Sequence, residues 1–394
     1  MPRHTKFFLA ALSAAVLGAV IAAQIGAETA PPVPTPAPAS LPTAPPAPTP
    51  TPTPVPASPR QAPVRVPAGA LELPIRGATG FSSIQLNLRS EPSAQATLLR
   101  QVPPGTAFRI LEEEGAYWRV ENDSFTGYLA HKYCMVNLPD VIPSIVYENT
   151  NASQSRVHSS GKRVPGVTGE ALYQARAYDE RLGREEFIMP VMYSMARKVC
   201  AAQQAALAQG DSLKLYEAYR PDGAQRAMVE ALAALAERDP EVQEGISAPP
   251  WKMSWFISLG TSNHQRGCAI DVSLVKVEAV KHHWSGDCAY NAVVKYREYD
   301  MPSPIHELSI ASAAFSAPVV SSSETAWKSA APAPAMNRAA LSLQRYCAGA
   351  GLTPLASEWW HFNDLATYRA LGENTGRGEA TLTQLFSVPP YAAP

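Results

Sequence analysis

The stretch TSNHQRGCAIDVSLV, residues 261–275, determines how the C-terminal half of the chain folds and where its chemistry lies. From Cys268 to Val275 every second side chain is apolar, which predicts a strand with one buried face. Asp271 lies on the opposite face of a strand that otherwise has the composition of a core. A buried carboxylate must be paired or bound to a metal, and His264 lies on the loop that enters the strand. We expect His264 and Asp271 to meet, either as a hydrogen-bonded pair or as two ligands of one metal ion.

The sequence around this strand predicts a mixed α/β or α+β region. Apolar residues recur at helical spacing over 186–209, and Gly210 follows as a stop signal. A second helix is expected over 222–238, and the segment 212–219 between the two helices has the pattern of a strand. The Ala-, Ser- and Pro-rich stretch 311–336 is expected to be an insertion or a mobile loop that either covers or opens a pocket.

Two other clusters carry polar groups that are suited to chemistry. In the segment 358–362 (EWWHF), Glu358 precedes His361 by three positions among aromatic residues. This cluster is either a metal ligand with a nearby general base or an aromatic core strand with a hydrogen-bonded histidine. In an ideal strand the two side chains would face opposite ways, so a bend is needed for both to reach one pocket. Arg220, at the end of the predicted strand, either presents its guanidinium to an oxyanion or forms a surface ion pair.

Together these residues form a set suited to metal-assisted amide hydrolysis. His264, Asp271 and His361 supply three nitrogen or oxygen ligands and leave one zinc position open, as in catalytic rather than structural zinc sites. Zinc lowers the pKa of bound water to about 7 and polarises a carbonyl group. A carboxylate that is not a ligand, such as Glu358, can then transfer protons. Arg220 fits stabilisation of the developing oxyanion.

Three motifs carry a resemblance to a known family. The runs S-x-H-x-x-G-x-A-x-D (residues 262–271), E-x-W-H (358–361) and Y-R-P (219–221) together resemble the zinc D-Ala-D-Ala metallopeptidases, in particular the VanX-type D-alanyl-D-alanine dipeptidases. The resemblance implies one Zn²⁺ ion held by His264, Asp271 and His361, with Glu358 as general base and Arg220 as the transition-state residue. It also implies that Ser262 contacts the substrate or supports the loop. The expected fold is an α+β peptidase domain over 139–394, with a central antiparallel sheet and helices.

The preceding segment, residues 78–138, predicts a small all-β barrel. Short alternating runs at 85–89, 108–111, 117–120 and 127–129 are separated by turn signals. The run LRSEP, the Pro-Gly turn, the W-x-V strand and the final Gly-Tyr-Leu resemble a bacterial SH3-like domain. The resemblance implies tethering to peptidoglycan. The alternative is a module that only packs against the peptidase domain.

The N-terminal segment indicates export. A positively charged start is followed by an uncharged apolar run over 7–23, which predicts a signal peptide over 1–27. An uncleaved anchor is the alternative. The chain has 38 prolines, concentrated in residues 31–59, and we expect a proline-rich disordered linker over 28–77. The protein is therefore expected to be periplasmic, associated with the cell wall or extracellular, with N-terminal anchoring left open and no stable membrane span elsewhere.

Composition excludes several other functions. With 33 Lys and Arg against 34 Asp and Glu, the chain lacks the basic excess of a nucleic-acid binder. Its 5 cysteines include no CxxC pair, which argues against a thiolate zinc site. A bridge between Cys268 and Cys288 is left open. The expected partners are peptidoglycan or peptides ending in D-Ala-D-Ala.

Alternatives to the zinc dipeptidase also follow from the sequence. Ser159 and Lys162 match the S-x-x-K motif of serine D,D-peptidases, although no Lys-Thr-Gly follows. A wall-binding protein with a non-catalytic peptidase fold is a third possibility. Within the zinc class, the free dipeptide, the end of a peptidoglycan stem peptide (carboxypeptidase activity) and an internal cross-link (endopeptidase activity) remain open as substrates.

Overall fold

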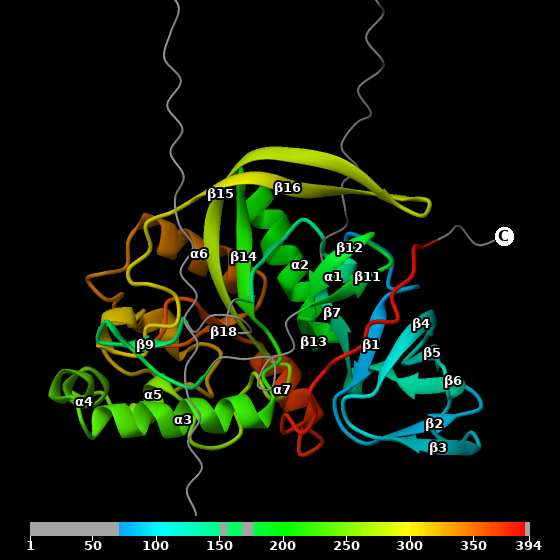
Figure 1. Cartoon of the computed structure of the whole chain (residues 1–394), viewed down its shortest axis with the longest axis horizontal. Helices are drawn as coiled ribbons and strands as arrows, with labels where there is room; N and C mark the ends of the chain where they lie inside the picture. The colour runs from blue at the N-terminus through cyan, green and yellow to red at the C-terminus, as the bar shows by residue number, and fades with distance from the viewer. Residues whose placement is uncertain (1–70, 150–155, 168–175, 391–394) are drawn as a thin grey trace, which may run out of the picture. The chain divides into compact units, whose positions relative to one another are not determined.

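The structure is a computed structural model that describes residues 71–149, 156–167 and 176–390 (Figure 1). The expected signal peptide over 1–27 lies outside the described residues, and so does most of the expected linker over 28–77. In the part of the chain that the structure describes, no helix is both long enough and apolar enough to cross a membrane.

The first part of the described chain forms an antiparallel sheet in the order β13-β7-β1-β4-β5-β6-β2-β3. Its strands are β1 (Thr79–Ser82), β2 (Leu86–Arg89), β3 (Leu98–Val102), β4 (Ala107–Glu114), β5 (Tyr117–Asn122), β6 (Phe125–Ala130), β7 (Cys134–Asn137) and β13 (Pro190–Met192). Alternate residues of β5 point inward, and Trp118 and Val120 are fully buried. The expectation of an all-β region is confirmed here.

The edge strand of this sheet, β13, comes from beyond residue 138. Val191 of β13 pairs with Val136 of β7, so the expected helix over 186–209 is wrong at its N-terminal end. The helix α2 spans Tyr193–Leu207, after the strand β12 (Arg184–Phe187) and β13. The apolar residues before Tyr193 are buried by pairing between strands and not by a helical face.

A second sheet has the order β17-β18-β15-β14-β8, with β16 paired to β15. Its strands are β8 (Val146–Tyr147), β14 (Asp211–Glu217), β15 (Ala269–Ser285), β16 (Cys288–Glu298), β17 (Thr353–Pro354) and β18 (His361–Asn363). Only β8 runs parallel to its neighbour. All seven residues of β14 are buried, and the strand that the pattern over 212–219 predicted is confirmed.

The strand β15 is longer than the run 268–275 predicted. Beyond Val275 it continues with β16 as a two-stranded ribbon that extends past the end of β14 (Figure 1). Its residues over 276–284 are exposed or partly buried. Because the outer part of the ribbon has no continuous apolar face, the alternation that predicts the strand ends at Val275.

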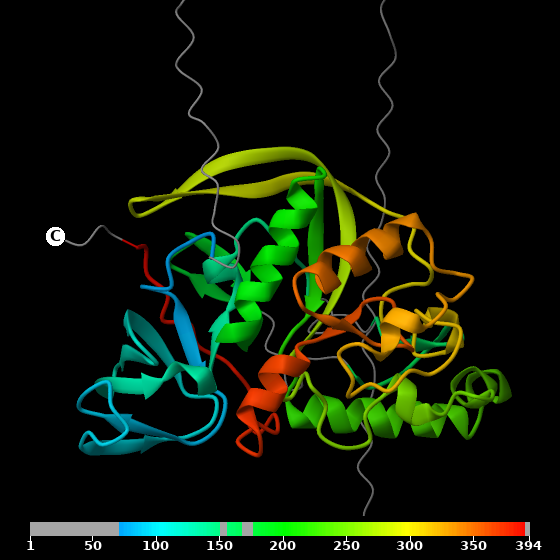
Figure 2. The same ribbon diagram turned by 180° about the vertical axis from the view of Figure 1, so that it is seen from behind.

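Two of the helices in the described residues pack on the second sheet. The helices are α1 (Leu138–Val141), α2, α3 (Asp222–Ala236), α4 (Pro240–Ser247), α5 (Met253–Phe256), α6 (Arg338–Gly349) and α7 (Leu365–Leu371). The helix α2 packs on β14 and α6 packs on β15, and Figure 2 shows both on the same side of the sheet. The second helix predicted from sequence, over 222–238, is α3. Two short hairpins complete the described strands: β9 (His158–Ser159) with β10 (Lys162–Arg163), and β11 (Arg176–Asp179) with β12.

The Ala-, Ser- and Pro-rich stretch 311–336 is mostly irregular, with short 3-10 turns at Ile310–Ser312 and Ala326–Ser329. It is attached to the body of the domain, since the amides of Ala314 and Phe315 both donate to the carbonyl of Ala356. Phe315 is buried in the core. Cys268 and Cys288 do not form a bridge, and all five cysteines of the chain are free.

Candidate metal centre

The register of three neighbouring strands places acidic and imidazole side chains in one row. Asp271 on β15 is paired with Glu217 on β14 and, on its other side, with His361 on β18. All three side chains are buried. Residues that lie opposite each other on adjacent strands point to the same face of the sheet. The backbone pairing therefore brings Asp271 and His361 together, although 90 positions separate them.

His264 reaches the same point from the loop before β15. The loop turns at Gly267, where φ is +68° and a Cβ atom would lie 2.8 Å from the sulfur of Met135. The position therefore requires glycine on both counts. The His264 ring is oriented by Nδ1–H, which donates to the carbonyl oxygen of Ala218 at 2.7 Å. This partner leaves the lone pair of Nε2 facing Asp271 and His361.

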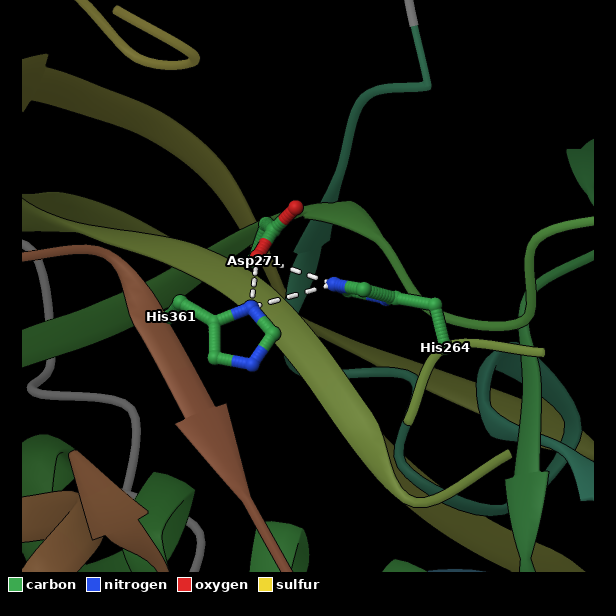
Figure 3. A group of neighbouring side chains, drawn as sticks. All are labelled: His264, Asp271 and His361. Atoms are coloured by element: carbon green, nitrogen blue, oxygen red, sulfur yellow. Dashed lines mark hydrogen bonds and ion pairs between the residues drawn. The ribbon is translucent and has the colours of Figure 1, made fainter. Parts of the chain in front are cut away.

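His361 is oriented in the same way from the other side. Its Nε2–H donates to Oδ1 of Asn363 at 3.0 Å, which leaves the Nδ1 lone pair facing inward. His361 Nδ1 lies 2.9 Å from Asp271 Oδ1 and 3.1 Å from His264 Nε2, and His264 Nε2 lies 3.2 Å from Asp271 Oδ1 (Figure 3). The structure thus brings together all three residues that the sequence predicted as ligands.

These three atoms are acceptors that converge on one point, and this arrangement fits a cation. Both imidazole N–H groups are used by Ala218 and Asn363, so two lone pairs and a carboxylate oxygen face each other in a buried space. Such a group is repulsive unless a positive charge lies between its members. Zinc ligands at about 2.0–2.2 Å place neighbouring donor atoms of a tetrahedron about 3.3 Å apart, close to the distances found here.

Glu358 lies next to this cluster without belonging to it. The amide of His361 donates to the carbonyl of Glu358 at 3.4 Å, which forms a turn between the two residues. Because of this turn both side chains point into one pocket, and the bend expected from the sequence is present. Glu358 Oε2 is 3.7 Å from His361 Nδ1. Burial raises the pKa of Glu358 to about 8, against the lowering effect of His361. A carboxyl group with a pKa in this range is suited to proton transfer near neutral pH.

Arg220 is held beside the cluster by a buried ion pair. Its Nε and Nη2 donate to the two carboxylate oxygens of Glu217, each at 2.7 Å, and Nη1 donates to Gln225 at 2.7 Å. Nη2 is also 3.6 Å from Asp271 Oδ2. The alternative of a surface ion pair is wrong, because Arg220 is only 6% exposed. Its guanidinium instead lines a cavity.

His306 is a site residue that the sequence analysis missed. Its Nε2 lies 3.3 Å from Asp271 Oδ2, the oxygen that does not face the other imidazoles. His306 has φ of +60°, a backbone conformation that is uncommon for non-glycine residues. His306 also forms a cluster with Asp271 and Glu217, but Glu217 is already occupied by Arg220. No motif or periodicity singles out this histidine in the chain.

The cluster forms the floor of a cavity of about 440 Å³. Ser262 also lines this cavity. Its backbone N–H donates to Oε1 of Gln265 and its hydroxyl oxygen accepts from the amide of Gln265, so these two residues close the turn that contains His264. Ser321 and Ser322, from the stretch 311–336, form part of the wall. The stretch 311–336 therefore borders the pocket.

Ser159 and Lys162 of the S-x-x-K motif are paired in register across the β9–β10 hairpin, but their side chains are bonded to other residues. The Ser159 hydroxyl donates to the carbonyl of Leu308, whereas Lys162 forms ion pairs with Asp239 and Glu241. Since a serine nucleophile needs its base within hydrogen-bond reach of the hydroxyl, and both side chains are bonded elsewhere, the arrangement gives no support to a serine mechanism.

Comparison with known proteins identifies one part of the chain. The bacterial SH3 domain family matches residues 84–134, which covers strands β2 to β6 and the turns between them. No curated protein matches the chain. Bacterial SH3 domains often bind cell-wall material, which is consistent with a wall-associated or extracellular protein. The chain thus contains a bacterial SH3 domain, followed by a mixed α/β region that carries the candidate metal centre.

Proposed function

We propose that the protein is an exported zinc metallopeptidase that hydrolyses D-alanyl-D-alanine at the ends of cell-wall peptides or as the free dipeptide. The observation that carries the proposal is the convergence of His264 Nε2, Asp271 Oδ1 and His361 Nδ1 within 3.2 Å of one another. The three sequence motifs that resemble the zinc D-Ala-D-Ala metallopeptidases contribute all of these residues, together with Glu358 and Arg220.

The ligands and the neighbouring groups divide the chemistry between them. His264, Asp271 and His361 would hold a zinc ion, which would supply an activated water and would polarise the carbonyl of the scissile amide. Ala218 and Asn363 fix the two rings through their other nitrogen atoms, and such partners orient the ligands of metal sites.

Glu358 moves the proton. Its carboxylate accepts a proton from the attacking water, whose oxygen forms a bond to the carbonyl carbon. The same carboxyl group then donates the proton to the amide nitrogen as the carbon–nitrogen bond breaks, so that one water is consumed and one amine and one carboxylate are released. The position of Glu358 on the cavity wall, beside the ligands but not among them, supports this role.

Arg220 stabilises the charge that develops on the carbonyl oxygen. Its two bonds to Glu217 fix the plane of the guanidinium, so little reorganisation is needed when the oxyanion forms. The SH3 domain would hold the enzyme near peptidoglycan, in which D-Ala-D-Ala ends are abundant, and this would raise the local substrate concentration.

One incubation series tests the proposal. The purified protein, with its zinc content measured, is given D-Ala-D-Ala, a stem pentapeptide and cross-linked cell walls, and released D-Ala is quantified. The proposal expects about one zinc per chain and release of D-Ala that a chelator abolishes. Zinc-loaded protein that binds cell walls but releases no D-Ala from any of the three would refute it and favour a non-catalytic wall-binding protein.

A further inference from the structure

The charges that line the cavity are asymmetric. The carboxylates on its wall are Asp271 and Glu358, one directed at the imidazoles and the other assigned to proton transfer. Glu324, close along the chain to the wall serines, is paired with Arg369. Within residues 71–149, 156–167 and 176–390, no carboxylate on the cavity wall is therefore left to receive an ammonium group.

Arg266, by contrast, is a cation on the wall with no acidic partner among the described residues. Its Nη1 donates to the carbonyl of Thr261 and to Oδ1 of Asn263, and its Cζ lies 4.9 Å from the centre of the Tyr368 ring. These contacts fix the plane of the guanidinium but do not neutralise it. Its Nε is buried and donates to none of the described residues. An oriented guanidinium without a counter-ion is the usual receptor for a carboxylate.

Building on the proposed function, we propose that Arg266 binds the terminal carboxylate of the substrate and that the substrate is a peptide whose D-Ala-D-Ala end is acylated at its amino side. A free dipeptide would bring an ammonium group into the cavity. Burying that charge without a partner is costly, whereas an amide nitrogen in a longer peptide carries no charge. The cavity volume of about 440 Å³ also leaves room for residues beyond two alanines. The assigned activity is therefore that of a carboxypeptidase.

A comparison of three substrates tests this inference. Zinc-loaded protein is given D-Ala-D-Ala, diacetyl-L-Lys-D-Ala-D-Ala, and the same tripeptide with its C-terminus amidated. We expect kcat/KM for the acetylated tripeptide to exceed that for the dipeptide by about 100-fold or more, and amidation to reduce it by about as much, since a site that leaves buried groups unpaired rejects a substrate by large factors.

Substitutions then test the role of Arg266 in binding the carboxylate. Arg266→Ala should lose about 100-fold in kcat/KM on the tripeptide acid but change little on the amide, because only the acid uses the guanidinium. Arg297→Ala is the matched control, since Arg297 also lies over a tyrosine ring but outside the cavity. Calorimetric titration of zinc-loaded Glu358→Gln with the three peptides supplies a binding measurement that does not depend on turnover.

The outcomes separate the two proposals. Release of D-Ala from the free dipeptide at the same rate as from the tripeptide, or faster, overturns this inference but leaves the peptidase function intact. An equal loss on acid and amide in Arg266→Ala, with equal titration affinities, overturns the role of Arg266. No release from any substrate by zinc-loaded protein overturns the proposed function and this inference with it.

Discussion

Removal of the metal should change the stability of the protein in a way that depends on Asp271. The three inward-facing acceptor atoms lie 2.9–3.2 Å apart, so the zinc site proposed above would be preformed in the folded chain and absent from the unfolded chain. A ligand that binds only the folded state stabilises it by about 4 kcal/mol at a free concentration 1,000 times its dissociation constant. For a domain of this size that corresponds to a rise of about 8–16 °C in the unfolding temperature.

Asp271→Asn should remove most of this rise. The variant keeps the shape of the side chain but loses the only anionic ligand, and a loss of about 100-fold in zinc affinity corresponds to about 2.7 kcal/mol. Thermal unfolding is followed for both proteins with zinc and with a chelator, so each protein is its own reference. Asp123→Asn, on an exposed turn between β5 and β6, is the matched control and should keep the full rise.

Two results would refute this reasoning. If zinc in large excess leaves the unfolding temperature of the unmodified protein unchanged, the converging acceptors do not hold the ion. If zinc raises the unfolding temperature of Asp271→Asn as much as that of the unmodified protein, the ion is bound elsewhere in the chain.

Other substitutions test the remaining roles. Glu358→Gln should retain zinc but reduce kcat by about 10²–10⁴-fold. Near-full activity in a substrate assay would contradict the general-base role. Glu373→Gln, at an exposed position, is the control. His306→Ala should lower zinc affinity by about 10–100-fold, because the contact of His306 Nε2 with Asp271 Oδ2 is lost, and His306→Gln should restore part of it. Competition titration with a chelating dye measures this affinity, and equal values for both variants would contradict the positioning role. Arg220→Lys should reduce kcat more than it raises KM in steady-state kinetics, since a lysine cannot form both bonds to Glu217. A change in KM alone would show that Arg220 acts in substrate binding and not in transition-state stabilisation.

Local sequence patterns predicted the parts of the site that lie within single elements. The alternation around Asp271 identified its strand, and the spacing of Glu358 and His361 showed that a bend was needed. Both inferences depend only on neighbouring residues, because side-chain direction follows the backbone period. The meeting of His264 with Asp271 was expected from the loop and the strand alone. The convergence of both with His361 rested on combining separate clusters and on motifs that resemble those of a family, since no local pattern encodes strand register over such a separation.

The features that were missed are those set by contacts between distant segments. Val191 and Met192 have apolar spacing compatible with a helix, but their pairing with β7 makes them a strand. Tertiary context of this kind overrides local propensity. His306 is distant in sequence from every motif, and only the folded chain shows that it faces the second oxygen of Asp271.

The same long-range contacts decide how the tethering role can be examined. The loop that carries His264 rests on the junction between the two sheets, since Gly267 lies against Met135 of β7 and its carbonyl accepts a hydrogen bond from the amide of Met192 of β13. Deletion of the chain before residue 138 would remove β7 and leave β13 without its partner. Such a truncation would disturb the metal centre as well as the SH3 domain. Wall binding must therefore be measured on the full chain, with exposed positions of β3 such as Leu98 and Leu99 substituted.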